Sequence, residues 1–186
     1  MLKLVPAKEV PFDSVIEYCE SFGNCRDYEC EVLEYADISE SAYKGALRDM
    51  KKNKGYLFYL IDDECPEYLI GLGNIANITA NYHSPIFDTG CLSGGIRPDE
   101  RNKGYASEIL PLLLKECKSL GLKEVCISCY KDNKASIKII ENNHGVLERN
   151  FFRDGCEALK YWIPTIKEKD KIKCKTLNYV GRKKSN

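Results

Sequence analysis

Apolar residues recur along this chain with two different periods, which divide it into alternating strands and helices. Helical spacing is clearest at 104–120, and shorter helical stripes fall at 12–22, between Asp37 and Gly55, and at 134–142. Runs rich in β-branched and aromatic residues predict the strands. Their ranges are 2–5, 56–61, 68–78, 92–96, 124–130, 146–152 and 158–163. Asp37, with Glu40 three residues later, is the expected N-cap of the second helix.

The order of these elements predicts a single α/β (α+β) domain with a mixed sheet. Strands 92–96 and 124–130 are joined through a long helix, so we expect them to be parallel. Hairpins elsewhere make the remainder of the sheet mostly antiparallel. The domain is expected to span 1–166, and the lysine-rich 167–186 is either a solvated basic tail or one late strand.

Charge and hydropathy exclude several classes of protein. Lys+Arg and Asp+Glu both number 28, so no net charge draws the chain to nucleic acid or to an anionic membrane. No apolar run approaches the roughly 20 residues that a membrane helix needs. The first residues lack the apolar stretch of a signal peptide, so we expect a cytoplasmic protein.

Ten cysteines allow either disulfides or buried thiols. Without an export signal we expect free thiols, because Cys91, Cys117 and Cys126 occupy apolar positions in the pattern. The Cys126–Cys129 spacing suits a metal, but residues three apart in a strand point to opposite faces. No second such pair exists and the histidines number 2, so we expect no metal.

The residues after strand 92–96 combine several features of a phosphate-binding site. Pro98 ends the strand, and Arg101 to Ala106 gives the spacing R-x-x-G-x-A before a long helix. Backbone N–H groups at a helix N-terminus lack intrahelical partners and attract anions. Gly104 permits close approach of a diphosphate, and Arg101 and Lys103 add positive charge. Taken alone, the segment also suits an ordinary strand-to-helix turn with solvated cations.

The sequence downstream of this loop contains further motifs in a fixed order. Ile96-Arg97-Pro98 and 101–106 are followed by Asp132-Asn133-Lys134-Ala135-Ser136 and by 141–148. This arrangement resembles the acetyl-CoA-binding motif of the GNAT superfamily of N-acetyltransferases. It is most similar to a poorly characterised bacterial group of predicted acetyltransferases, whose Leu-Val-Pro start and Tyr-Trp-Ile end correspond to 4–6 and 161–163.

The resemblance implies a GNAT-like domain in which the parallel strand pair splays apart to admit the pantetheine arm of acetyl-CoA. Backbone groups at Ile96 and Arg97 would bind that arm. Asn133 would hold the arm or the thioester, with Ser136 as a weaker contact, although Asn133 also suits a helix N-cap. The diphosphate would be bound by the side chain of Arg101 and by the backbone N–H groups of five residues. These five are Asn102, Lys103, Gly104, Tyr105 and Ala106.

Two departures from the family pattern leave the catalytic residues open. The tyrosine that protonates the departing thiolate in many members is replaced by Ile140, and the usual glycine pair is His144-Gly145. Tyr130 and His144 are alternative acids. No general base stands out among the residues in segments that can line the acceptor side. These are Glu29, Glu31, Glu34, His83 and Asp88.

The predicted function is direct acetyl transfer from acetyl-CoA to a primary amine of a small molecule. Acetylation of a peptide or protein N-terminus is the alternative within enzymes. A non-catalytic acyl-CoA-binding regulatory domain is the alternative outside them. A homodimer is one option for the assembly, and sequence alone fixes neither the oligomeric state nor the acceptor.

Overall fold

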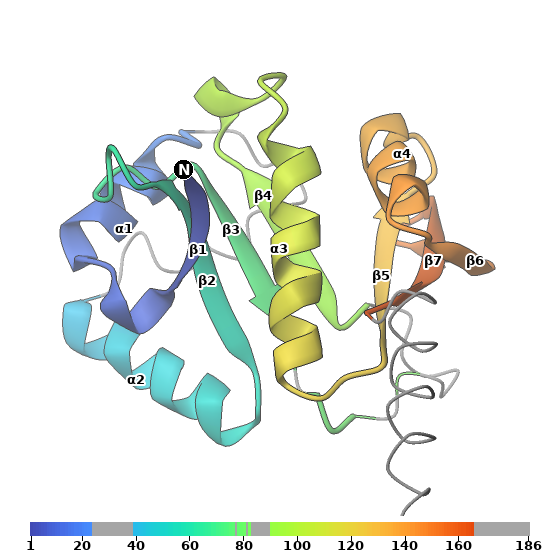
Figure 1. The fold of residues 1–186 in the computed structure, drawn as a ribbon, viewed down its shortest axis with the longest axis horizontal. Helices are drawn as coiled ribbons and strands as arrows, with labels where there is room; N and C mark the ends of the chain where they lie inside the picture. Colours follow the sequence, from blue (N-terminus) through green and yellow to red (C-terminus); the bar gives the residue numbers. More distant parts are fainter. Residues whose placement is uncertain (24–38, 77, 81, 83–89, 166–186) are drawn as a thin grey trace, which may run out of the picture.

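The computed structural model describes residues 1–23, 39–76, 78–80, 82 and 90–165, and these form one seven-stranded sheet flanked by helices (Figure 1). The sheet order is β1-β2-β3-β4-β5-β7-β6. The strands are β1 (Leu2–Pro6), β2 (Tyr56–Asp62), β3 (Gly71–Ile75), β4 (Leu92–Ile96), β5 (Glu124–Tyr130), β6 (Val146–Arg153) and β7 (Cys156–Pro164). The helices are α1 (Phe12–Glu20), α2 (Glu40–Lys52), α3 (Tyr105–Ser119) and α4 (Lys134–Asn142), with 3₁₀ turns η1 (Ala7–Glu9) and η3 (Pro98–Glu100).

Strand directions follow the connections between strands. The pairs β1–β2, β2–β3, β3–β4, β5–β7 and β6–β7 are antiparallel, and β4–β5 is parallel. Helix α3 makes the crossover between the parallel strands, as a strand–helix–strand unit requires. The predicted mixed, mostly antiparallel sheet with one parallel pair is therefore confirmed.

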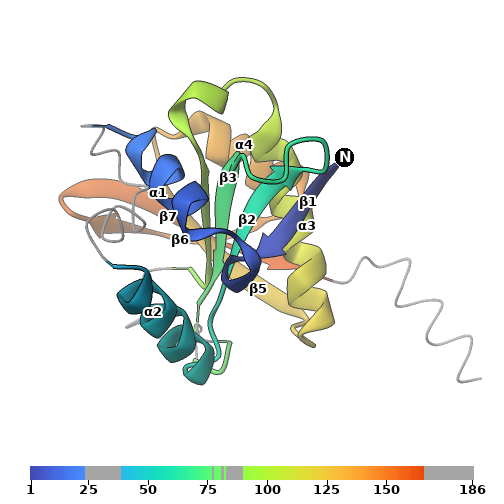
Figure 2. The ribbon, with the colours of Figure 1, turned by 90° about the vertical axis from the view of Figure 1, so that its left-hand side faces the viewer.

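Helices cover both faces of the sheet (Figures 1 and 2). On one face, Tyr18 of α1 and Tyr43 of α2 pack around Tyr59 of β2 in a buried cluster. On the other, Leu113 and Cys117 of α3 belong to the larger core beneath that helix. Burial of these apolar stripes supplies the main favourable free energy of folding.

Three details differ from the sequence-based expectations. The N-cap of α2 is Ser39, whose Oγ accepts a hydrogen bond from the N–H of Ala42 at 3.3 Å, whereas the predicted cap Asp37 lies outside the described residues. Strand β3 is shorter than the predicted 68–78. Strand β7 is longer than the predicted 158–163.

Three segments with sequence-based expectations lie wholly or mostly outside the described residues. They are 24–35, which the sequence predicts to be irregular, most of 79–88, which it predicts to be a surface loop, and 167–186.

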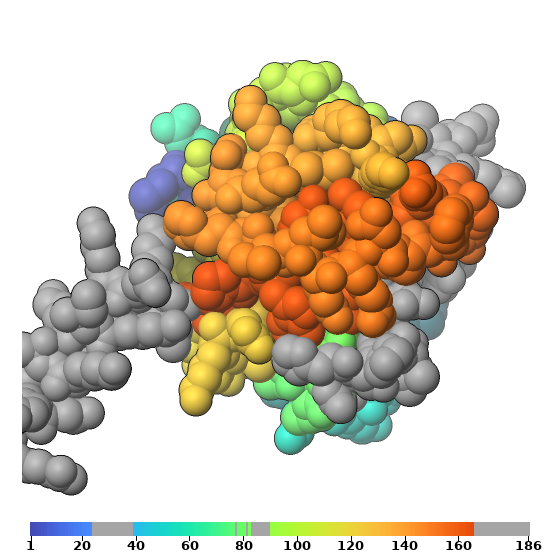
Figure 3. Space-filling view, turned by 90° about the vertical axis from the view of Figure 1, so that its right-hand side faces the viewer, coloured from blue at the N-terminus to red at the C-terminus, as the bar shows by residue number. Residues whose placement is uncertain are grey.

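Strand β6 is one edge of the sheet, next to β7, and the residues of α4, β6 and β7, in orange to red, make up much of the face shown in Figure 3. Among the described residues, three of the four exposed large hydrophobic side chains lie on β6: Val146, Leu147 and Phe152. None of the helices in the described ranges is long and apolar enough to cross a membrane.

Candidate functional site

Strands β4 and β5 diverge almost as soon as they meet. Within the described residues they form one bridge pair, Leu92 with Ile127, whereas β3 and β4 are paired along their whole length. Beyond Leu92, β4 continues without a partner on its β5 side. A parallel pair in the middle of a sheet thus leaves one stretch of strand edge open.

The backbone of Gly94 and Ile96 faces this opening. The N–H of Arg97 donates to the carbonyl oxygen of Ile70 at 3.0 Å, so Arg97 and alternate residues before it turn their peptide groups toward β3. Gly94 and Ile96 lie at the intervening positions. Gly94 is exposed despite its place in a central strand. Gly94 was not predicted to bind the cofactor, because its orientation follows from the register between β3 and β4 and not from a local sequence pattern.

The loop after β4 has an unusual backbone. Turn η3 (Pro98–Glu100) leads into Arg101, whose Nε donates to the carbonyl oxygen of Ile96 at 3.1 Å. Asn102 and Gly104 then adopt positive φ angles of 62° and 93°. Asparagine and glycine tolerate this left-handed region better than other residues. A Cβ added to Gly104 would meet no heavy atom within 4 Å, so the position opens outward.

This backbone leaves a set of N–H groups without a hydrogen-bond acceptor among the described residues at the start of α3. Within the described part of the chain, no acceptor bonds the N–H groups of the five residues from Asn102 to Ala106. The first internal bond of this turn is Ser107 N–H to the carbonyl oxygen of Gly104 at 2.9 Å. The N-terminal dipole of the 15-residue α3 adds positive potential at the same place. Such an arrangement suits an anion with several acceptor oxygens.

Side chains around the loop add cations. Lys103 is half exposed and its Nζ lies 2.9 Å from Oε1 of Glu100. Arg101 is half-buried beside the open strand edge, because its Nε bonds the Ile96 carbonyl. Except for Arg97, the residues from Ile96 to Ala106 that were predicted to bind the cofactor therefore lie together at the end of β4, in the loop and at the start of α3.

Arg97 points elsewhere. Its guanidinium is buried and bonds Glu17 of α1 and Asp99, while its N–H is bound within the sheet. Neither group faces the opening between β4 and β5.

Asn133 lies at the C-terminal end of β5, across the opening from the loop. Its Oδ1 accepts a hydrogen bond from the N–H of Ser136 at 3.0 Å, so it caps helix α4. The capping role considered from the sequence is confirmed. The Ser136 side chain is half-buried in the first turn of this helix.

Ile140 belongs to the core. It is 1% exposed, and the N–H of Gly145 donates to its carbonyl oxygen at 3.0 Å. His144 is exposed, with a φ of 66°, in the left-handed conformation after a helix that glycine usually adopts. Tyr130, at the end of β5, donates to Oδ2 of Asp154 at 3.4 Å.

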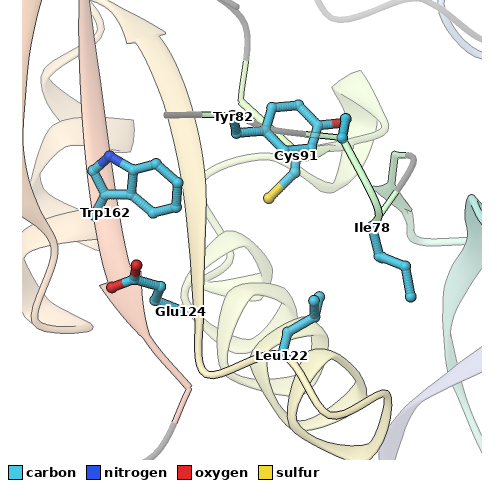
Figure 4. A pocket seen from close by; sticks show the side chains of 7 residues that line it. Ile78, Tyr82, Cys91, Leu122, Glu124 and Trp162 are labelled. Carbon is cyan, nitrogen blue, oxygen red and sulfur yellow. The ribbon is translucent and has the colours of Figure 1, made fainter. Parts of the chain in front are cut away.

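A pocket of about 150 Å³ lies at the opposite, N-terminal ends of β4 and β5 (Figure 4). Tyr82, Cys91 and Trp162 line it together with Glu124 at the start of β5. Burial, with smaller contributions from Cys91 and Cys126, raises the pKa of Tyr82 to about 12, so its phenol is neutral at physiological pH. The remaining lining residues are Ile78, Ala80 and Leu122.

Two other expectations concern metals and general bases. Among the described residues, no group of three or more His, Cys, Asp or Glu side chains is placed to hold a metal ion. The acceptor-side residues considered as bases all lie outside the described residues. They are Glu29, Glu31, Glu34, His83 and Asp88.

Solved structures with the same fold are acetyltransferases. Spermidine N-acetyltransferase from Vibrio cholerae, in complex with CoA and spermine, is 18% identical with a TM-score of 0.64, covering 88% of this chain and 95% of its own. RimL, a ribosomal L7/L12 alpha-N-protein acetyltransferase in complex with Coenzyme A, is 16% identical with a TM-score of 0.60, covering 88% and 92%. At these identities the likeness establishes the fold.

Sequence comparison establishes the family. No curated protein sequence gives a significant match to this chain. The profile of the Acetyltransferase (GNAT) domain, however, matches residues 4–146, which include β4, the loop, α3, β5 and α4. This chain therefore belongs to the GNAT family of N-acetyltransferases.

Proposed function

We propose that this enzyme transfers an acetyl group from acetyl-CoA directly to a primary amine of a small molecule. The observation that carries the proposal is the row of N–H groups from Asn102 to Ala106, which have no acceptor among the described residues, next to a strand edge left open by the divergence of β4 and β5. Together these supply an anion site and an edge for an extended amide-bearing chain, the two features that a CoA thioester presents.

The residues that would hold acetyl-CoA follow from this geometry. The five loop N–H groups bind the diphosphate, with Arg101 and Lys103 adding charge. The pantetheine amides bond the backbone of Gly94 and Ile96, which turn toward the opening. Gly94 thus takes the place that we expected for Arg97. Asn133 and Ser136 contact the arm from the β5 side.

The chemistry needs little beyond positioning. The amine nitrogen attacks the thioester carbonyl carbon, and the resulting oxyanion needs a donor such as a β4 backbone N–H. Collapse expels the CoA thiolate, which takes up a proton, while the amine loses one. Holding both reactants in a near-attack arrangement supplies much of the rate enhancement.

The pocket of Figure 4 is our proposed acceptor site. An arm that starts at the loop after β4 and runs back along that strand directs its thioester toward Leu92, beside the pocket residue Cys91. The volume of about 150 Å³ is below the roughly 300–1,000 Å³ typical of drug-sized ligands, which favours a small amine. We expect the reaction to take place in the cytoplasm.

Particular observations support two alternative functions. The RimL structure is that of a protein N-terminal acetyltransferase, so a peptide N-terminus is a second acceptor class. Ile140 is buried where a catalytic tyrosine is expected, which supports the alternative of a non-catalytic acyl-CoA-binding domain.

A pair of glycine variants tests the cofactor site. Gly104 and Gly121 flank the two ends of α3, both have positive φ, and a Cβ added at either would meet no heavy atom within 4 Å. Gly104→Glu and Gly121→Glu therefore impose similar backbone strain. We expect Gly104→Glu to weaken acetyl-CoA binding by at least about 30-fold in calorimetry, because it sets a carboxylate where phosphate binds.

Gly121→Glu should bind acetyl-CoA like the parent protein. Equal affinities of the parent and Gly104→Glu would refute the site. Release of free thiol from acetyl-CoA, screened over small amines and peptides, then separates the acceptor classes. Binding without turnover on any acceptor would favour the regulatory alternative.

A further inference from the structure

A buried arginine joins the loop of the proposed diphosphate site to α1. The Arg97 side chain is 4% exposed, and its Nη1 and Nη2 lie 2.9 and 2.7 Å from the two carboxylate oxygens of Glu17. Its Nε donates to Oδ1 of Asp99 at 2.8 Å, and Nη1 also reaches the carbonyl oxygen of Leu69 at 3.3 Å. Every nitrogen of the guanidinium is thus engaged.

Tyr68 closes the same network from the β2–β3 connection. Its ring stacks on the Arg97 guanidinium at 4.2 Å, and its hydroxyl donates to Asp99 at 3.2 Å and to Glu100 at 3.1 Å. Glu100 in turn pairs with Lys103. Contacts therefore run without a break from α1 to the loop residue beside Gly104.

The loop needs such support because its backbone is strained. Asn102 is a non-glycine residue held at positive φ, a sparsely populated conformation that persists when the surroundings determine it. The arginine fork fixes two carboxylates in a plane, which a lysine ammonium would not do. Asp99, held in this way, belongs to the turn that leads directly into Arg101 and Asn102.

We propose that Arg97 is a positioning residue that holds the Pro98–Gly104 loop in the form that receives the diphosphate of acetyl-CoA. The inference rests on the proposed function and adds to it the role of a residue that does not touch the cofactor. Its consequence is specific: loss of Arg97 should impair donors that carry the diphosphate and spare donors that lack it.

The test compares two acetyl donors, acetyl-CoA and S-acetylpantetheine, which has the same thioester arm without the diphosphate. For Arg97→Lys we expect kcat/KM with acetyl-CoA to fall about tenfold, mainly through KM, as expected for lost cofactor binding. With S-acetylpantetheine the change should stay within about twofold. Glu17→Gln, which keeps the shape of the side chain on α1, should also lower kcat/KM for acetyl-CoA relative to kcat/KM for S-acetylpantetheine.

Val15→Ala is the matched control, because Val15 is fully buried on the same helix as Glu17 and its apolar side chain makes no hydrogen bond or ion pair in the network. It should affect both donors equally. Equal losses for both donors in Arg97→Lys and Glu17→Gln would overturn the positioning role. If the parent enzyme itself uses both donors equally well, the diphosphate site of the proposed function fails instead.

Discussion

Cys91 and Cys126 exchange hydrogen bonds across the two parallel strands. The N–H of each residue points to the sulfur of the other at 3.2 Å, and the N–H of Cys91 also donates to the carbonyl oxygen of Cys126 at 2.9 Å. These contacts directly precede the Leu92–Ile127 pair. They therefore mark the end of the β4–β5 opening that lies nearest the pocket.

The buried thiols should be unreactive in the folded enzyme. The hydrogen bond with Cys126 and burial hold the pKa of the Cys91 thiol well above its ordinary value, and burial raises those of Cys117 and Cys129 to about 12 and about 11. The thiolate is the reactive form, so iodoacetamide at pH 8 should leave these three unmodified.

Cys65 and Cys156 are exposed and should be alkylated readily under the same conditions. Peptide mass mapping before and after denaturation measures the difference. Rapid alkylation of Cys91 in the native protein, or a disulfide in place of the free thiols, would contradict the prediction.

The same thiols should make stability fall at alkaline pH. Unfolded cysteine ionises near pH 8.5, whereas folded Cys117 and Cys129 keep their protons up to about pH 12 and about pH 11. Between these values the folded state binds more protons than the unfolded state, so the free energy of unfolding decreases as pH rises. The contribution is fully present below about pH 8.5.

Thermal unfolding from pH 7 to 10.5 should show a declining Tm above about pH 8.5. The double variant Cys117→Ala, Cys129→Ala should be less stable at neutral pH but should show a shallower decline. An unchanged slope in the double variant would show that groups other than Cys117 and Cys129 cause the decline in Tm.

Two glycine-to-alanine changes should have opposite effects on stability. A Cβ on Gly71 would lie 2.7 Å from Cδ1 of Ile96 and 2.8 Å from the carbonyl oxygen of Gly95, so Gly71→Ala should destabilise by about 1–3 kcal/mol. Gly45, inside α2, has its nearest such contact at 3.7 Å. Gly45→Ala should stabilise by roughly 0.5–1 kcal/mol, because alanine favours the helix. Urea unfolding of both variants measures the sign of each change in the free energy of unfolding.

The elements that repeated patterns or capping residues define could be predicted from the sequence. The period of Ile109, Leu113 and Cys117 gave the buried face of α3, and Asn133 marked the start of α4. The parallel pair followed from the connection through α3. The cap of α2 was placed two residues early because Asp37 and Ser39 both suit the position, and local preference alone does not choose between them.

Features that depend on register or on distant partners could not be read from the chain. Gly94 faces the opening because of how β4 is aligned with β3, which a local pattern does not encode. Arg97 looked like a cofactor residue from its place in the motif, yet its partner Glu17 lies 80 residues away. A charged residue at the end of a strand can be recognised as part of a buried ion pair only when its oppositely charged partner is known.

The last prediction concerns the protons of the transfer step. Ile140, buried where a tyrosine acid is expected, has no proton to give. A thiolate of pKa near ~8.5 departs without obligatory help, and general-acid assistance is typically worth about 10²–10⁴ in rate. A free alkylamine with pKa near ~10 is mostly protonated at neutral pH, and only its neutral form attacks.

Deprotonation of the acceptor should therefore dominate the pH dependence, and kcat/KM should rise from pH 6 to about 9 without a steep alkaline fall. Tyr130→Phe and His144→Gly test the two remaining acids, and glycine also suits the positive φ at position 144. Neither change should alter the profile. A sharp bell whose alkaline limb disappears in one variant would identify that residue as the acid, because loss of its proton at high pH would then be what slows departure of the thiolate.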